Sequence, residues 1–368
     1  MNKNSIKKVL IYNPFGIGDV IFSTPMLMVL AKNIPGVNIS YICNTRTYWI
    51  LKNNPYVNDI IVYEKDHFRQ LAENSKPRFL KKLILFFKKI KSINADALID
   101  LSLNYQASLA AKFMRIPKRI GFNYRGRGRF LTDKIDLDGF EKKHVVFYYM
   151  DLLKLLGLEA NSKVFTEVFV SGEDEKWSDE SIKKNNLCGK IILGLIPGGG
   201  KSWGINARYR RWPVSNFAHV AGKVIDNFNY SIILFGDIAE IDLCSNIESF
   251  IHHKVINMCG KTTIGQLLAL MKKCSMILCN EGGPLHIAVA LGVPTVSIFG
   301  PVDEKIYGPY SEDNGKHIVI NSETKCRPCY SKFKHNECTN VACLNSISED
   351  EVFGAIKKLS EAIKIGRI

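Results

Sequence analysis

Residues 279–301 combine a glycine turn with the start of a helix, an arrangement suited to binding phosphate or diphosphate. They read CNEGGPLHIAVALGVPTVSIFGP. An apolar run ends at Cys279, a helical pattern runs from Pro284 to Gly292, and a second apolar run follows at 295–299. Backbone N–H groups and the positive end of a helix dipole attract anions at such a place. The candidate ligand residues are Glu281, Gly282, Gly283, Pro284 and His286. The alternative for His286 is ordinary packing on its helix.

A second glycine-rich stretch carries basic side chains. Residues 196–202 read IPGGGKS, but Leu195 stands where a triphosphate-binding loop needs glycine, so nucleoside triphosphate hydrolysis is not expected. We expect a loop after a strand, where nearby cations neutralise a diphosphate through charge-assisted hydrogen bonds. The cations are Lys201, Arg208, Arg210 and Arg211. A solvated basic loop is the alternative.

Two carboxylates follow predicted strands. Residues 13–19 read NPFGIGD, in which Gly16 and Gly18 form half of a dinucleotide fingerprint or simply a tight turn. Asp19 lies in the first helical turn, where it either caps the dipole or acts as a general base. Because an ordinary Asp has a pKa of ~4, a base role requires a dry, well-positioned setting. Glu240 accepts from ribose hydroxyls or begins a surface helix.

Four cysteines form a compact group near the C-terminus. Cys326, Cys329, Cys338 and Cys343 surround His335, and tetrahedral binding of zinc or iron by thiolates is chemically reasonable. The spacing differs from that of a common zinc ribbon, so free thiols in a folded loop are the alternative. Any metal here is expected to be structural.

The segment 79–91 is predicted to be a basic amphipathic helix. Its apolar face is formed by Leu80, Leu83, Ile84, Phe87 and Ile90. Packing against the core is the default interpretation, and docking on an anionic membrane is the alternative. Further basic residues at 115–129 extend the positive charge. No recognition helix, zinc finger or RNA-binding signature is present, so nucleic acid is not an expected partner.

The bulk properties describe a folded protein with an acidic partner. The chain has 368 residues, 46% of them hydrophobic and 23% charged, with a net charge of +15. We expect no signal peptide, because the apolar run 9–12 is too short, and no membrane span. Ten cysteines without a secretion signal indicate a reducing compartment.

Strand-like and helix-like segments alternate twice along the chain, which predicts two α/β domains with parallel sheets. Strands are expected at 8–12, 38–42, 60–63 and 97–100, then at 190–196, 230–235, 275–279 and 295–299. Helices are expected at 19–32, 213–227 and 262–273, with Thr262 as an N-cap. The predicted domains are 1–160 and 190–346, joined by 161–189, with a last helix in 347–368 that opens on a capping box at Ser348 and Glu351.

These motifs together resemble glycosyltransferase family 9, the heptosyltransferase family. Residues 16–19 with Pro25 look like its N-terminal motif, and 197–199 leading to 210–213 look like its central motif. Residues 282–286 and 299–301 are similar to its sugar-nucleotide motif. The resemblance extends over nearly the whole chain, in order and spacing. One departure is that Glu281 and Gly282 stand where the family often has Asp followed by Ser or Thr.

The resemblance implies the GT-B fold: two Rossmann-like, doubly wound domains, a central cleft and a C-terminal helix that crosses back onto the N-terminal domain. It implies inverting, metal-independent transfer of heptose from ADP-heptose to a lipopolysaccharide core acceptor. Asp19 is then the base, Arg210 the basic group near the leaving phosphate, and Glu240 the acid on the nucleotide side. The N-terminal domain is expected to bind the acidic acceptor at the cytoplasmic face of the inner membrane.

Other functions remain open at this point. One is a transferase of the same fold that uses another nucleotide sugar, such as a UDP-hexose. A sugar-nucleotide epimerase would convert the donor without an acceptor. A non-catalytic protein that binds anionic glycans would show steep salt dependence and no turnover of a donor.

Overall fold

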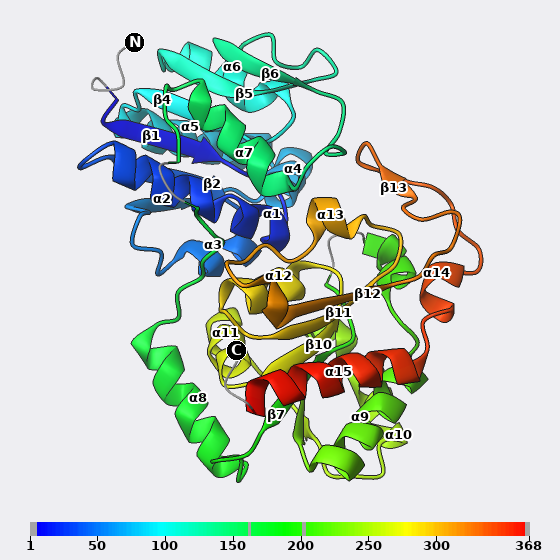
Figure 1. Cartoon of the computed structure of the whole chain (residues 1–368). Helices are drawn as coiled ribbons and strands as arrows, with labels where there is room; N and C mark the ends of the chain where they lie inside the picture. Colours follow the sequence, from blue (N-terminus) through cyan, green and yellow to red (C-terminus); the bar gives the residue numbers. More distant parts are fainter. Residues whose placement is uncertain (1–5, 161–162, 201–203, 365–368) are drawn as a thin grey trace. The chain divides into compact units, whose positions relative to one another are not determined.

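The computed structural model describes residues 6–160, 163–200 and 204–364, and they divide into two compact units. The first unit contains residues 1–140 and 145–164, and the second contains 141–144 and 165–368. Each unit is built on a six-stranded sheet covered by helices (Figure 1). Within the described residues, no helix is both long and apolar enough to cross a membrane.

The sheet of the first unit has the strand order β3-β2-β1-β4-β5-β6, and every neighbouring pair is parallel. The strands are β1 Lys8–Tyr12, β2 Asn38–Cys43, β3 Asp59–Val62, β4 Ala97–Asp100, β5 Lys118–Tyr124 and β6 Asp133–Leu137. The helices are α1 Ile17–Phe22, α2 Thr24–Asn33, α3 Thr45–Leu51, α4 Lys65–Asn74, α5 Lys76–Ile93, α6 Tyr105–Phe113 and α7 Val145–Lys154. This strand order reverses between β1 and β4, which is where ligands bind in such sheets.

The second unit repeats this plan with the order β12-β11-β10-β7-β8-β9, again parallel throughout. The strands are β7 Ile192–Ile196, β8 Ser231–Leu234, β9 Ile256–Asn257, β10 Met276–Asn280, β11 Thr295–Phe299 and β12 His317–Asn321. The helices are α8 Gly172–Lys184, α9 Val214–Phe228, α10 Ile241–Phe250, α11 Ile264–Lys272, α12 Gly283–Ala290, α13 Glu304–Tyr307, α14 Ala342–Asn345 and α15 Glu349–Lys364. Short 3-10 segments at Gly204–Arg210, Ile238–Glu240 and Asn314–Lys316, and a hairpin of β13 Tyr330–Ser331 and β14 Lys334–His335, complete the unit.

The eight strands predicted from the sequence all occur, with shifts of one or two residues at their ends. Two details of the predicted helices are wrong. The helix expected at 19–32 is two helices, because helix α1 ends before Ser23 and a new helix, α2, begins at Thr24 with Pro25 in its first turn. The N-cap of α11 is Thr263 rather than Thr262, and Thr263 forms a capping box with Gln266.

The described part of the C-terminal helix packs into the second unit. Val352, Ile356 and Leu359 of α15 lie in the core of the second unit, and Ser360 hydrogen-bonds Tyr230 there. Their i, i+4, i+7 spacing places them on one face of the helix, and this face covers α9, β11 and β12. Helix α15 therefore completes the second domain, and the expected packing of the C-terminal segment on the first domain stays a prediction.

The predicted connection 161–189 is largely part of the second unit. Helix α8 packs on α11 of that unit. Lys272 at the end of α11 pairs with Glu175 of α8 at 2.8 Å, and Lys273, the C-cap of α11, pairs with Asp179 at 2.5 Å. The acidic first turn of α8 and its Ser171 N-cap explain why this polar segment is helical. Residues 161 and 162 lie outside the described part.

Helix α5 exposes most of its apolar face, contrary to the default interpretation of core packing. Only Ile90 is buried, whereas Leu80, Ile84 and Phe87 are 55%, 46% and 36% exposed. Ile90 and Phe86 contact the core on one face of the first sheet, together with Leu10 of β1. The remaining apolar stripe of α5 is only partly covered by the described residues.

Candidate functional site

The candidate site lies at the carboxyl edge of the second sheet, where the strand order reverses between β7 and β10. Residues 197–200 follow β7, and Glu281 and Gly282 follow β10. Both loops contain glycines at positive φ: Gly199 at 74°, Gly200 at 84° and Gly282 at 145°. The two glycine-rich motifs, which are more than eighty positions apart in the sequence, therefore lie next to each other.

Two glycines are required because other groups occupy the space of a side chain. A Cβ on Gly282 would lie 2.5 Å from the carbonyl oxygen of Gly199, and a Cβ on Gly198 would lie 1.9 Å from the Glu240 carboxylate. Close approach of this kind is a principal use of glycine. The departure from the family's Ser or Thr at position 282 thus has a local reason: the backbone of the neighbouring loop fills the space.

Asn280 connects three segments of the site. Its buried amide donates to the carbonyl of Pro197 at 2.6 Å, and its side-chain oxygen accepts from the backbone N–H of Trp212 at 3.0 Å. Because a buried amide is costly unless its hydrogen bonds are made, this arrangement holds the loops in one geometry. Asn280 was not among the predicted site residues, although a polar residue at the end of a fully buried strand was the available signal.

A buried ion pair joins the central motif to the glycine turn. The guanidinium of Arg210 donates through Nε and Nη2 to the two carboxylate oxygens of Glu281, and Nη2 also donates to the Glu281 carbonyl at 3.2 Å. The Arg210 and Glu281 side chains are 8% and 4% exposed. This bidentate geometry fixes the guanidinium beside the start of α12. An anionic ligand that binds there would compete with Glu281 for Arg210.

A second pair lies beside it. Arg211 donates from Nε to the carbonyl of Gly198 at 2.7 Å, and its Nη2 lies 3.4 Å from the Glu240 carboxylate. Glu240 is buried and also accepts from the backbone N–H of Asp237 at 3.0 Å. The structure therefore places this acid at the carboxyl end of β8, next to the glycine loop.

The first turn of α12 presents backbone N–H groups without a side-chain cap. Gly282 is its N-cap and makes no side-chain hydrogen bond, and Pro284 occupies the first turn, where its missing N–H costs nothing. His286 is buried in the same turn. Burial, with smaller contributions from His144 and Arg210, lowers the pKa of His286 to about 3, so the imidazole is neutral near pH 7.

His144 reaches this region from the short segment 141–144, which belongs to the second unit. Its Nε2–H donates to the carbonyl of Gly308 at 3.1 Å, and its ring stacks on Tyr310 at 5.1 Å. Burial lowers the pKa of His144 to about 4. Below the ordinary imidazole pKa of ~6.5 the unfolded chain binds a proton on each of these histidines, whereas the folded chain does so only near pH 4 and below, so acid destabilises this region.

Asp19, the predicted base, lies in the first unit, in the first turn of α1. Its Oδ2 accepts from the backbone N–H of Gly16 at 3.3 Å, which closes the first turn of α1. Buried Asn13 supports the turn by donating to the Asp19 carbonyl at 3.3 Å and to the Tyr41 hydroxyl at 3.1 Å. Gly16 has an extended conformation with φ at −79°, which any residue adopts. The capping interpretation of Asp19 is thus confirmed, and its role as a base stays a prediction.

Asp100 is a titratable group that the sequence analysis did not identify. It ends β4 beside Tyr12 and accepts from the backbone N–H and hydroxyl of Ser102 at 3.0 and 2.6 Å. Burial raises its pKa from 3.8 to about 6. A carboxylate at the reversal point of the first sheet was the signal that could have found it.

Replacement of this group has a defined pH dependence. Because the folded pKa of Asp100 lies above the unfolded one, its stabilising effect is complete below about pH 4 and is lost as the pH rises to about 6. Asp100→Asn removes this titration. Between pH 4 and pH 6 the free energy of unfolding of the variant should therefore increase relative to that of the wild type, by about 3 kcal/mol in total. Urea unfolding at pH 4, 5 and 7 measures the gain, with exposed Asp138→Asn as the control. If the difference in unfolding free energy between Asp100→Asn and the wild type is the same at all three pH values, this prediction is wrong.

The cysteines near the C-terminus approach one another without forming a metal-binding geometry. Cys329 Sγ lies 3.8 Å from His335 Nε2, and Cys338 Sγ accepts from the backbone N–H of Val341 at 3.3 Å. Burial, with the neighbouring thiols, raises the pKa of Cys343 to about 11. In the described part of the chain, no group of three or more His, Cys, Asp or Glu is arranged to hold a metal. A structural metal at Cys326, Cys329, Cys338 and Cys343 stays a prediction.

The second unit thus assembles six of the predicted ligand residues at one sheet edge and adds one that the sequence did not reveal. The six are Arg210, Arg211, Glu240, Glu281, Gly282 and His286, and the added residue is Asn280. Gly283 and Pro284 form the helix start that follows. Arg208 is exposed, and Lys201 lies outside the described residues. Gly16, Gly18 and Asp19 belong to the first unit.

Comparison with other sequences finds relatives along nearly the whole chain. The family model for glycosyltransferase family 9 (heptosyltransferase) matches residues 84–340. Lipooligosaccharide heptosyltransferase 2 of Campylobacter jejuni is 28% identical over 363 residues, which cover 96% of this chain and 99% of that protein. Lipopolysaccharide heptosyltransferase 2 of Escherichia coli is 22% identical over 315 residues, which cover 83% and 86% of the two chains.

Solved structures share the architecture. A glycosyl transferase family 9 protein from Veillonella parvula superposes with a TM-score of 0.79 at 25% identity, covering 98% of this chain and 99% of its own. The ADP-heptose LPS heptosyltransferase II of E. coli superposes with a TM-score of 0.75 at 21% identity, covering 97% and 99%. Together with the two parallel sheets, these likenesses confirm the predicted GT-B fold.

Proposed function

The chain belongs to glycosyltransferase family 9, and from this premise we propose that it transfers a heptose from ADP-heptose to a lipopolysaccharide core acceptor. The names of the relatives from C. jejuni and E. coli support the sugar and the class of acceptor. The observation that carries the proposal is the buried guanidinium of Arg210 beside the uncapped start of α12.

The diphosphate of the donor binds where Arg210 meets the glycine turn. The backbone N–H groups of the first turn of α12 and the positive dipole end face the phosphate oxygens. Arg210 exchanges its contact with Glu281 for the ligand, and its charge stabilises the diphosphate as the bond to the sugar breaks. Glu240, buried at the end of β8, accepts from a ribose hydroxyl of the nucleotide.

Asp19 acts as the general base of the reaction. Its carboxylate takes the proton of an acceptor hydroxyl, and that oxygen forms a bond to the anomeric carbon of the donor. The bond from this carbon to the phosphate oxygen breaks, and the nucleoside diphosphate leaves with the electron pair. Attack from the face opposite the leaving group inverts the anomeric configuration. The turn held by Asn13 and Gly16 supports this role because it fixes the position of the Asp19 carboxylate.

The enzyme works at an anionic surface, the cytoplasmic face of the inner membrane. Helix α5 carries seven Lys or Arg side chains and no Asp or Glu, and it exposes Leu80, Ile84 and Leu85. Basic residues near an anionic bilayer contribute about 1 kcal/mol each, and exposed apolar side chains add burial at the interface. The net charge of the whole chain, +15, has the same sign as the charge of α5 and also favours an anionic surface.

Ligand-induced stabilisation tests the identity of the donor. A ligand that binds only the folded protein raises its melting temperature, and at a concentration of 100 times Kd the gain is about 2.7 kcal/mol. We expect ADP and ADP-heptose to raise the melting temperature and UDP-hexoses and GDP-sugars to leave it unchanged. Stabilisation by UDP-sugars alone would replace the proposed donor with another nucleotide sugar while leaving the family assignment intact.

A further inference from the structure

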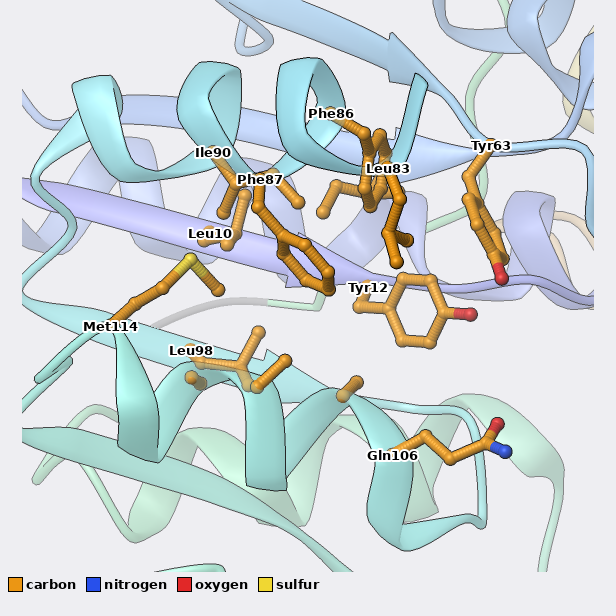
Figure 2. A pocket seen from close by; sticks show the side chains of 14 residues that line it. Leu10, Tyr12, Tyr63, Leu83, Phe86, Phe87, Ile90, Leu98, Gln106 and Met114 are labelled. Atoms are coloured by element: carbon orange, nitrogen blue, oxygen red, sulfur yellow. The ribbon is translucent and has the colours of Figure 1, made fainter. Parts of the chain in front are cut away.

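The first unit contains an apolar pocket between α5 and α6 that the proposed reaction does not use. Its volume is about 110 Å³, of the same order as apolar cavities of ~150 Å³ that bind benzene. Helices α5 and α6 form its sides, and strands β1 and β4 form its floor (Figure 2). Its lining includes Tyr12, Tyr63, Phe87, Leu98, Gln106 and Met114.

The pocket has a polar end and an apolar end. Figure 2 shows the hydroxyls of Tyr12 and Tyr63 and the amide of Gln106 at one end, with Met114 toward the other. Tyr12 is the last residue of β1, so the polar end lies at the carboxyl edge of the sheet. Burial raises the pKa of both tyrosines, which therefore stay neutral donors. A long apolar chain with a polar head matches this polarity.

The rim of the pocket is apolar and positively charged. One stripe of α5 borders the pocket. It consists of residues spaced i, i+4, i+7 and i+11, which are Leu80, Ile84, Phe87 and Lys91. Three members of this stripe are exposed apolar side chains. Neither α5 nor α6 contains an Asp or Glu. Exposed Lys76 precedes Leu83 by seven positions, so it lies on the pocket-facing side of α5 toward the polar end. The Nζ of Lys82 lies 5.5 Å from the ring centroid of Phe68, which is 5.0 Å from that of Tyr63. These charges are complementary to an anionic head group.

We propose that this pocket holds part of one acyl chain of an anionic membrane lipid, with Lys76 and Lys82 of α5 contacting the head group. The proposal deepens the membrane docking in the proposed function by naming what the surface recognises. Each methylene that enters an apolar site contributes about 0.8 kcal/mol, which is about a fourfold gain in affinity. A few buried methylenes therefore suffice for selective binding of a single chain.

The small residues of α6 allow the pocket to be filled without changing a polar group. Ala110→Phe places a ring among Leu98, Phe87 and Met114, where it takes the space of the chain. The probe is cis-parinaric acid, an anionic fatty acid whose fluorescence increases in apolar sites, titrated below its micelle concentration. We expect saturable one-to-one binding by the wild type and at least a tenfold weaker affinity for Ala110→Phe. Phe113→Ala, at the exposed end of α6 and outside the pocket, should bind like the wild type.

Competition identifies the source of the chain. Lysophosphatidylglycerol should displace the probe, and zwitterionic lysophosphatidylcholine should displace it at least tenfold less well. Displacement by neither lipid, or an Ala110→Phe affinity equal to that of wild type, would overturn the proposal. If Ala110→Phe unfolds non-cooperatively, the milder Ala107→Val serves as the filling variant, with an affinity loss of at least threefold expected. Because the titration contains neither donor nor acceptor, failure to bind lipid would leave the proposed transfer reaction untouched, and loss of transfer would leave this result standing.

Discussion

Asp19→Asn is expected to lower kcat by about 10²- to 10⁴-fold, the range that general-base catalysis contributes. The amide has the size of the carboxylate and still accepts the hydrogen bond from the Gly16 N–H. It lacks the negative charge and basicity needed to take a proton from a hydroxyl. The loss should therefore appear in turnover with little change in the folded structure.

The same variant should bind ADP as the wild type does, because Asp19 belongs to the first unit and the residues of the diphosphate site belong to the second. Initial rates with saturating donor, together with calorimetric titration of ADP, separate the two effects. Asp66→Asn is a matched control, since Asp66 also lies in the first turn of a helix in this unit and is exposed. Near-normal turnover by Asp19→Asn would remove the base assignment.

Arg210→Ala is expected to damage both stability and activity. The substitution leaves the buried Glu281 carboxylate without its guanidinium partner, and breaking a buried pair in this way costs about 3–5 kcal/mol. It also removes the positive charge that stabilises the leaving diphosphate, for which a loss of about 10²- to 10³-fold in kcat is typical. Urea unfolding and initial rates measure the two losses.

A second substitution distinguishes these roles. Arg210→Met combined with Glu281→Leu removes both charges, so it should recover most of the lost stability without recovering activity. Arg210→Lys keeps the charge but not the two-point contact, and should lie between wild type and alanine in activity. Arg208→Ala, an exposed neighbour in the same 3-10 segment, is the control. If the double variant is as active as wild type, Arg210 has no role in the reaction.

Local signals explain what the sequence predicted well. The glycine turn and α12 were found because an apolar strand, two glycines and Pro284 follow one another directly, and each signal depends only on neighbouring residues. Strand β1 and the turn to Asp19 were found in the same way. In contrast, β5 and β6 were missed, because their burial is mixed and their sequences are rich in charged residues.

The errors concern long-range partners. The stripe of Val352, Ile356 and Leu359 shows that one face of α15 is buried, but not which domain buries it. The stripe on α5 similarly predicts a covered face, whereas three of its members are exposed. The pairing of Arg210 with Glu281 spans 71 positions and depends on β7 lying beside β10, which follows from topology rather than from local pattern.

Incubation of the purified protein with ADP-heptose and a heptose-deficient lipopolysaccharide core acceptor tests the central claim most directly. Mass spectrometry of the acceptor should show the addition of one heptose, with release of an equal amount of ADP, in wild type but not in Asp19→Asn. An unchanged acceptor mass with ADP-heptose, while another nucleotide sugar is transferred to the same acceptor, would contradict the account.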